Sequence, residues 1–209
     1  LVGTHNRMEK ELIPKRGIKY EEVEIYGFSK SNIKLDIKNV NCIRKAIKKC
    51  VKIMREFQPD IVLGIGGYVT FPVIVAAHRL SIKTFLHEQN SLPGKTNLYL
   101  QKYADLIGVS FKESASYFKK CKGEVFFSGN PCGENALSLE PMSKKDLGLS
   151  QNKKLIVVVA GSLGSATVNS KMQEFLKNTK GKEYEVLYIT GKSHYDEFIK
   201  DKDFPKNVK

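Results

Sequence analysis

Apolar and polar positions alternate along the chain in a repeating order of strand-like and helix-like patterns. The run from Asp60 to Ile65 carries apolar side chains toward both faces, which is typical of a buried parallel strand. The strongest strand pattern runs from Leu155 to Ala160. The longest helical pattern runs from Asp36 to Phe57. Shorter patterns predict helices at 6–13 (capped by Asn6), 71–80, 93–103, 112–118, 166–176 and 194–200, and strands at 18–25, 82–86, 105–109, 124–127 and 184–190.

This alternation predicts an α/β fold with doubly wound parallel sheets. We expect two α/β domains, at 1–132 and 154–209, joined by a polar linker at 133–153. The chain opens on Leu1-Val2-Gly3, which reads as the end of a strand, and its last residues complete no element. Both domains are therefore expected to be incomplete, and the chain to be an internal fragment.

The net charge and the cysteine pattern narrow the classes of partner. The 209 residues carry a formal net charge of +13, which favours nucleic acid, anionic lipid or a phosphorylated substrate. Lysine-rich soluble proteins can be this basic without a functional reason, so the charge alone decides nothing. No apolar run approaches the roughly 20 residues that span a bilayer. The four cysteines form no Cys-x-x-Cys pair, which argues against a zinc site and for reduced thiols.

Two glycine-rich loops stand where a predicted strand ends and a helix begins. They are Gly64-Ile65-Gly66-Gly67-Tyr68 and Gly161-Ser162-Leu163-Gly164. Backbone N–H groups at a helix N-terminus attract phosphate, and ligands of open α/β sheets collect at this edge. Neither loop has a dinucleotide-binding or Walker A pattern, so a tight turn that needs glycine only for its geometry stays an open interpretation of each. Two such loops on two domains favour a cleft.

His87-Glu88-Gln89-Asn90 is the strongest candidate for chemistry. These four consecutive polar residues directly follow the strand predicted at 82–86, so they are hard to explain as core. They offer a base, an anion and amide groups at the sheet edge that also carries the first glycine loop. The alternative is a solvated loop in which His87 merely caps the strand. The position of the motif at the carboxyl end of a strand favours a functional role.

The helix predicted at 36–57 is basic as well as amphipathic. Its charged residues include Arg44, Lys45, Lys48, Lys49, Lys52 and Arg55. Helices of this kind can lie on anionic membranes, although most charge runs are solvated faces and the apolar stripe first of all packs on the sheet. Asp201-Lys202-Asp203 has the spacing of a metal-binding Asp-x-Asp motif but no third ligand, so no metal site is predicted.

Several short motifs occur in an order and spacing that one enzyme family shares. They are Gly66-Gly67-Tyr68-Val69, His87-Glu88-Gln89-Asn90, Pro93-Gly94, Thr96-Asn97, Gly129-Asn130-Pro131, and Gly161-Ser162-Leu163-Gly164 with Asn169. The pattern resembles the MurG family, whose members add N-acetylglucosamine to the lipid-linked muramyl-pentapeptide of peptidoglycan synthesis. The likeness runs over the whole chain, and the combination of motifs is far more specific than any single glycine loop.

The resemblance implies a GT-B fold, in which two Rossmann-like domains face a cleft. The amino-terminal domain would hold the undecaprenyl-diphosphate acceptor, and the carboxyl-terminal domain would hold UDP-N-acetylglucosamine. The sugar would move with inversion at its anomeric carbon, without a metal or another cofactor. The basic surface would dock on anionic lipid, as expected for a peripheral protein at the cytoplasmic face of the bacterial cell membrane.

The resemblance also implies roles for single residues. Donor-binding positions are Asn90, Ser162, Gly161 and Gly164, acceptor-binding positions are Gly66, Gly67 and Tyr68, and supporting catalytic positions are His87 and Glu88. The family's first glycine loop, with the histidine proposed as base, would precede Leu1. The segment that holds uracil and ribose would follow Lys209, so the fragment is expected to be inactive alone. Many members carry arginine where this chain has Gly133.

Two other functions stay open at this point. The first is a related GT-B transferase that glycosylates another membrane lipid, which would lack the His-Glu-Gln-Asn motif in this position. The second is a basic α/β module that binds nucleic acid. Such a module needs aromatic side chains among its lysines for base stacking, and the segment 44–55 has none. We therefore expect no nucleic-acid partner.

Overall fold

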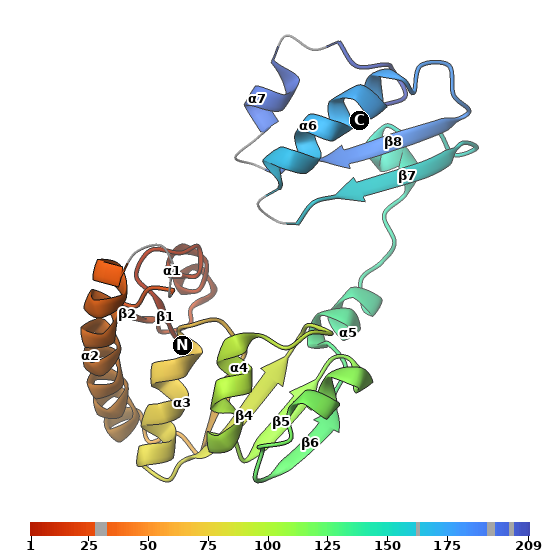
Figure 1. Cartoon of the computed structure of the whole chain (residues 1–209). Coiled ribbons are helices and arrows are strands. Elements are labelled where there is room, and N and C mark those ends of the chain that lie inside the picture. Colours follow the sequence, from red (N-terminus) through yellow and green to blue (C-terminus); the bar gives the residue numbers. More distant parts are fainter. Residues whose placement is uncertain (28–32, 162–163, 192–194, 201–202) are drawn as a thin grey trace. The chain divides into compact units, whose positions relative to one another are not determined.

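The computed structural model describes residues 1–27, 33–161, 164–191, 195–200 and 203–209, which divide into two units, Leu1–Ser138 and Leu139–Lys209 (Figure 1). The division falls within 133–153, the stretch in which the sequence analysis expects the linker. A short helix that the sequence analysis did not predict, α5 (Pro131–Leu137), leads into it. Asn130 caps α5 by accepting a hydrogen bond from the backbone N of Cys132 at 3.0 Å, and proline is well suited to the first helical position.

The described strands of unit 1 form two parallel sheets. β1 (Val2–Thr4) pairs with β2 (Glu21–Val23). The larger sheet has the order β3 (Ile61–Gly64), β4 (Lys83–Glu88), β5 (Leu106–Val109) and β6 (Glu124–Phe127). Val23 in β2 and Val62 in β3 are buried in the same hydrophobic cluster, so both sheets contribute to one core.

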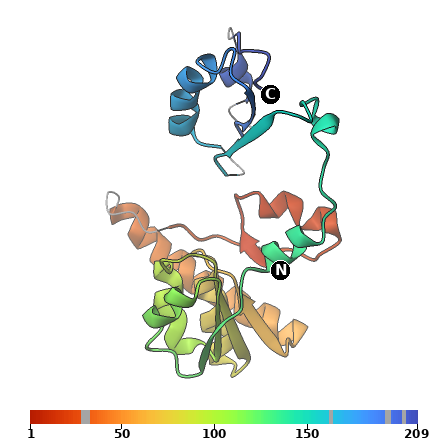
Figure 2. The ribbon, with the colours of Figure 1, turned by 90° about the vertical axis from the view of Figure 1, so that its right-hand side faces the viewer.

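The helices of unit 1 connect these parallel strands. They are α1 (Glu9–Leu12), α2 (Ile33–Phe57), α3 (Thr70–Arg79) and α4 (Lys95–Leu100), with 3₁₀ helices at Pro14–Arg16, Gln101–Tyr103 and Lys112–Tyr117. α2 and α3 pack side by side (Figures 1 and 2). α1 begins after Met8, whose side chain caps nothing, so the prediction that Asn6 caps this helix was wrong.

Only one face of β3 is buried, which corrects the prediction that this run is covered on both sides. Val62 and Gly64 face α3, and a Cβ atom on Gly64 would lie 2.6 Å from Thr70 Cγ2. Ile61 and Leu63 alternate with them and are 51% and 56% exposed. An apolar run in the sequence therefore shows that a strand can be buried on both faces, but not that it is.

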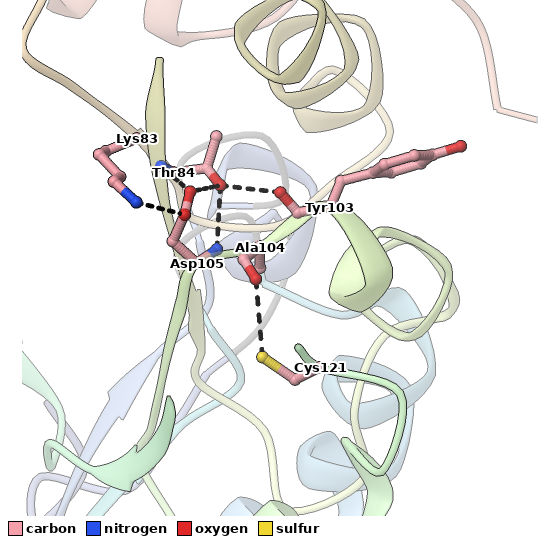
Figure 3. Close-up of polar contacts among 6 residues, drawn as sticks. All are labelled: Lys83, Thr84, Tyr103, Ala104, Asp105 and Cys121. Carbon is pink, nitrogen blue, oxygen red and sulfur yellow. Dashed lines mark hydrogen bonds and ion pairs between the residues drawn. The ribbon is translucent and has the colours of Figure 1, made fainter. Parts of the chain in front are cut away.

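A carboxylate fixes the pairing of β4 and β5 at their amino-terminal ends (Figure 3). Asp105 Oδ2 accepts hydrogen bonds from Thr84 N at 2.9 Å and Thr84 Oγ1 at 3.0 Å, and its Oδ1 lies 3.0 Å from Lys83 Nζ. Thr84 Oγ1 also donates to the carbonyl of Tyr103 at 2.9 Å. The hydrogen bond from Lys83 is the main cause that holds the pKa of Asp105 below its usual value, with further hydrogen bonds from Thr84.

Unit 2 is a small α/β unit. β7 (Lys154–Val159) and β8 (Tyr184–Ile189) form a parallel pair, α6 (Ala166–Lys177) connects them, and α7 (Tyr195–Ile199) follows. Its core is built from Leu176, Val186, Tyr188 and Phe198. In the part of the chain that the structure describes, no helix combines the length and apolarity needed to cross a membrane.

Candidate functional site

The carboxyl end of β4 carries two buried polar side chains. His87 and Glu88 are the last residues of the strand, and their exposed fractions are 5% and 1%. The sequence analysis ended this strand at Leu86 and placed both residues after it, so this boundary was wrong. The pairing of β4 with β5 continues through Glu88 and Val109, which leaves only Gln89 and Asn90 of the motif beyond the sheet.

Glu88 accepts four hydrogen bonds, three from the loop that follows β4 and one from α4. Its Oε1 accepts from the backbone N and the Nδ2 of Asn90, at 3.0 and 2.9 Å. Its Oε2 accepts from Gly94 N at 3.0 Å and Asn97 Nδ2 at 2.9 Å. Burial alone would raise the pKa of Glu88, but these hydrogen bonds outweigh burial and hold the pKa below its usual value. Glu88 is therefore an ionised carboxylate whose two oxygens are both occupied.

His87 is held at both ring nitrogens. Gln89 Nε2 lies 3.0 Å from His87 Nδ1, and His87 Nε2 lies 3.0 Å from the carbonyl oxygen of Gly129. An amide nitrogen can only donate and a carbonyl can only accept, so Nδ1 accepts and Nε2 carries the proton. His87 thereby joins the end of β4 to the segment that precedes α5.

The first glycine loop lies beside this motif. Gln89 Nε2 donates to the carbonyl oxygen of Ile65 at 3.1 Å, which ties the end of β3 to the end of β4. Gly66 and Gly67 have φ angles of 92° and 74°, a conformation that glycine adopts without strain. A Cβ atom on Gly66 would lie 3.7 Å from Asn97 Nδ2. The structure therefore brings together the predicted residues of unit 1 at one sheet edge.

Asn90 is the exposed member of the motif, and its backbone is fixed from both sides. Its N–H donates to Glu88, and its carbonyl oxygen accepts from Ser114 Oγ at 3.0 Å. Ser114 is fully buried and also donates to the carbonyl of Ser91 at 3.0 Å. Asn90 therefore projects from a rigid support.

Sequence reasoning assigned no role to two further residues of this region. Arg7 donates a hydrogen bond to Tyr68 Oη at 3.1 Å, and its guanidinium lies 5.2 Å from the centre of that ring. Asn97 is buried, donates to the carbonyl of His87 at 3.2 Å, and its Oδ1 has no hydrogen-bond partner among the described residues. The Thr96-Asn97 motif could have singled out Asn97 as a functional residue, whereas no pattern in the sequence singles out Arg7.

The second glycine loop belongs to unit 2. Gly161 and Gly164 have φ angles of 77° and 72°, and a Cβ atom on Gly164 would lie 2.0 Å from the carbonyl oxygen of Thr190. Ser165 caps α6 by accepting from Val168 N at 3.4 Å. Gly164 therefore packs against Thr190, directly after β8, and α6 begins two residues after Gly164. Ser162, a predicted donor contact, lies outside the described residues.

Asn169 supports this loop from within unit 2. Its Nδ2 donates to the carbonyl of Thr190 at 3.2 Å, and its Oδ1 accepts from Tyr188 Oη. Burial raises the pKa of Tyr188, so this hydroxyl stays a donor at neutral pH. Across the described residues, no group of three or more His, Cys, Asp or Glu side chains is arranged to hold a metal ion. Asp201 and Lys202 of the Asp-x-Asp pattern lie outside those residues.

Comparison with known families and sequences gives one consistent result. Residues 1–109 match the N-terminal domain of glycosyltransferase family 28. A Bacillus pumilus protein is 38% identical over 211 residues, which cover 99% of this chain and 57% of that protein. A Bacillus thuringiensis protein is 40% identical over 212 residues, with shares of 99% and 57%. Both are named UDP-N-acetylglucosamine--N-acetylmuramyl-(pentapeptide) pyrophosphoryl-undecaprenol N-acetylglucosamine transferase, the second with the suffix 2, and the chain spans a little over half of their length.

Solved structures show a likeness of fold. MurG from Acinetobacter baumannii superposes with a TM-score of 0.66 at 24% identity, over 99% of this chain and 56% of that one. The UDP-GlcNAc 2-epimerase from Methanocaldococcus jannaschii superposes with a TM-score of 0.56 at 13% identity, over 100% and 63% of the two chains. At these identities the likeness concerns the fold alone, and it confirms the predicted α/β fold of the GT-B kind.

Proposed function

The chain belongs to glycosyltransferase family 28, and we propose that it serves a peptidoglycan N-acetylglucosaminyltransferase of the MurG type. The reaction moves N-acetylglucosamine from UDP-N-acetylglucosamine to undecaprenyl-diphosphate-linked N-acetylmuramyl-pentapeptide, with inversion at the anomeric carbon. Relatives at 38% and 40% identity over 99% of the chain carry this activity in their names, which supports the proposal. The residue roles below are parts of the same proposal.

The observation that carries the proposal is the juxtaposition of His87–Asn90 with the Gly66–Gly67 loop. A hydrogen bond from Gln89 to Ile65 links the two segments directly. In open α/β sheets this carboxyl edge is where ligands bind. We assign Gly66, Gly67 and Tyr68 to the acceptor diphosphate, whose charge backbone N–H groups and the nearby Arg7 would attract.

The geometry limits the chemistry that His87 and Glu88 can perform. Both nitrogens of His87 and both oxygens of Glu88 are engaged in hydrogen bonds within the protein. A general base must reach the hydroxyl proton that it removes. In the proposed reaction these two residues therefore hold the neighbouring residues of the site in place. Another group acts as the general base. The donors at Gly161, Ser162 and Gly164, at the start of α6, would stabilise the departing UDP.

The basic face of α2 supports a peripheral site of action on anionic lipid at the cytoplasmic face of the membrane. The apolar stripe of this helix, including Ala46, Ile47 and Cys50, is buried in the core of unit 1. The basic side chains remain exposed, namely those of Arg44, Lys45, Lys48, Lys49, Lys52 and Arg55. Attraction to a membrane through α2 would therefore be electrostatic rather than hydrophobic.

The test uses the protein expressed from its complete gene, with radiolabelled UDP-N-acetylglucosamine and a lipid-linked muramyl-pentapeptide analogue. Label should move to the lipid in the parent protein. Asn90→Ala and Ser162→Ala should each lower kcat/KM by about tenfold or more, because each removes a polar contact to the donor. Lys177→Ala, an exposed change on α6, is the control and should retain the parent rate.

Circular dichroism must show that each variant is folded. Transfer only to a different lipid would replace the peptidoglycan assignment by the related GT-B transferase. No transfer to any lipid would refute the proposed function.

A further inference from the structure

Gln89 joins the first glycine loop to the neighbouring strand of the sheet. The residue pairing of β3 with β4 ends at Gly64 and Leu86. One residue beyond this pair, the carbonyl oxygen of Ile65 accepts a hydrogen bond from Gln89 Nε2 at 3.1 Å. The same nitrogen lies 3.0 Å from His87 Nδ1. A side chain that follows β4 therefore continues the connection between the two strands past their last residue pair.

The neighbours of Gln89 determine which way its amide points. The carbonyl of Ile65 can only accept, and His87 Nδ1 accepts because Nε2 gives its proton to the carbonyl of Gly129 at 3.0 Å. Both contacts therefore require the amide nitrogen of Gln89, and its two protons serve one contact each. Turning the amide over would place its oxygen against two acceptors, so the orientation is fixed.

The other end of the glycine loop is held by its own helix. Thr70 Oγ1 donates to the carbonyl oxygen of Gly66, and Thr70 N donates to that of Gly67 at 3.3 Å. Thr70 is the first residue of α3 and is buried. A Cβ atom on Gly66 would lie 3.7 Å from Gln89 Oε1, so the loop also passes close to this amide. The loop is therefore held between α3 on one side and Gln89 on the other.

We propose that Gln89 is a positioning residue that holds Gly66 and Gly67 in the conformation that binds the acceptor. This inference rests on the proposed function, which assigns the loop to the acceptor diphosphate, and it adds the residue that keeps the loop in place. Backbone N–H groups bind an anion well only when they point at it together. Without the contact to Ile65 the loop samples other conformations, and the acceptor binds only the competent fraction.

The test measures kcat and both Michaelis constants of the protein from its complete gene, with UDP-N-acetylglucosamine and the lipid-linked muramyl-pentapeptide analogue. Gln89→Met keeps the length of the side chain but has no N–H group. It should raise KM for the lipid analogue by about fivefold, the worth of one hydrogen bond, and leave kcat and KM for the UDP-sugar within about twofold. A general structural defect would instead lower kcat and change both Michaelis constants.

Gln89→Glu separates the two contacts of the amide. A carboxylate beside His87 Nδ1 favours the protonated imidazole, which then donates to it. The contact to His87 is thus kept, whereas the carbonyl of Ile65 faces an oxygen and loses its donor. KM for the lipid analogue should rise at least as much as in Gln89→Met. Nitrogen-15 NMR of the His87 ring should show a proton on Nε2 alone in the parent protein and on both nitrogens in this variant.

Gln101→Met is the matched control. The amide of Gln101 also bridges two backbone segments, because Nε2 donates to the carbonyl of Leu98 at 2.6 Å and Oε1 accepts from Lys120 N at 2.7 Å. Gln101 lies before the amino-terminal end of β5, whereas the glycine loop follows the carboxyl-terminal end of β3 in the same parallel sheet. This variant should lose stability but keep the parent's KM for the lipid analogue.

The two proposals fail in different ways. If the parent protein transfers no sugar to the lipid analogue, the proposed function and this inference are both overturned. If the parent is active, only the inference is overturned by a Gln89 variant that keeps the parent's KM for the lipid analogue, or by an equal rise in Gln101→Met. A parent ring protonated at Nδ1, or a Gln89→Glu ring with one proton, would also overturn it. Thermal unfolding of each variant shows that the measured constants come from folded protein.

Discussion

Asp105 and Glu88 are carboxylates of adjacent strands at opposite ends of the larger sheet in unit 1. Both have a lowered pKa, but the partners differ. Asp105 is partly exposed and pairs with a lysine, whereas Glu88 is buried and accepts only from neutral amides. Hydrogen bonds to a carboxylate favour its ionised form, as a nearby positive charge also does. The same residue chemistry thus anchors a strand pair at one edge and the loop after β4 at the other.

Asp105→Asn should lower the free energy of unfolding at neutral pH by about 1 kcal/mol, since it weakens a set of partly solvated hydrogen bonds. The lowered pKa of Asp105 means that its contribution is present above the unfolded pKa of about 3.9 and is lost as pH falls through the folded value. Urea unfolding of both proteins between pH 7 and pH 3 measures the difference. If the difference in the free energy of unfolding between the two proteins were the same at pH 3 as at pH 7, this account would be contradicted.

At the scale of elements, sequence patterns located most strands and helices and misplaced several ends. α2 and β7 were recognised because long periodic or continuous apolar runs leave few alternatives. β4 was ended two residues early because His87 and Glu88 are polar, and only their contacts with the loop explain why they can be buried. α5 was missed because a seven-residue helix depends on its Asn130 cap and Pro131 more than on periodicity.

Gly164→Ala should destabilise unit 2 by about 3 kcal/mol, because the new Cβ would meet the Thr190 carbonyl at 2.0 Å and the φ angle is 72°. Gly181→Ala is the matched control. Its φ angle is 76° but a Cβ there meets nothing within 4 Å, so only the backbone strain of about 1 kcal/mol applies. Hydrogen exchange of the β7 and β8 amides reports both changes. Equal effects would mean that the close approach to Thr190 is not what requires glycine.

At the scale of the whole molecule, composition indicated an anionic partner but could not choose one. The net charge of +13 is a property of the chain, whereas membrane attraction depends on where the charges lie. The fold class and the common edge of the first glycine loop and His87–Asn90 were predictable, because both follow from strand order. The network around Glu88 was not, since it joins side chains whose orientation no pattern in the sequence encodes.

Lys45→Glu, Lys48→Glu and Lys52→Glu together should weaken binding to vesicles of anionic phospholipid by at least about tenfold, given about 1 kcal/mol for each basic residue near the surface. Co-sedimentation of the complete gene product measures the binding. The control variant carries the same three changes at Lys177, Lys180 and Lys182, so its net charge is identical. Binding should also fall as salt is added. Equal loss in both variants would show that the overall charge, and not α2, drives the attraction.

A strand with unpaired amide groups along one side is a template for any other extended chain. Within the described residues β3 pairs only with β4, and Ile61 and Leu63 line it with half-exposed apolar side chains. Two copies that meet along this side would continue the sheet from one molecule into the next. Concentrated solutions of this chain should therefore form β-rich assemblies unless another segment of polypeptide pairs with the free side of β3 first. In a cell, the chain would then be prone to aggregate until that pairing has formed.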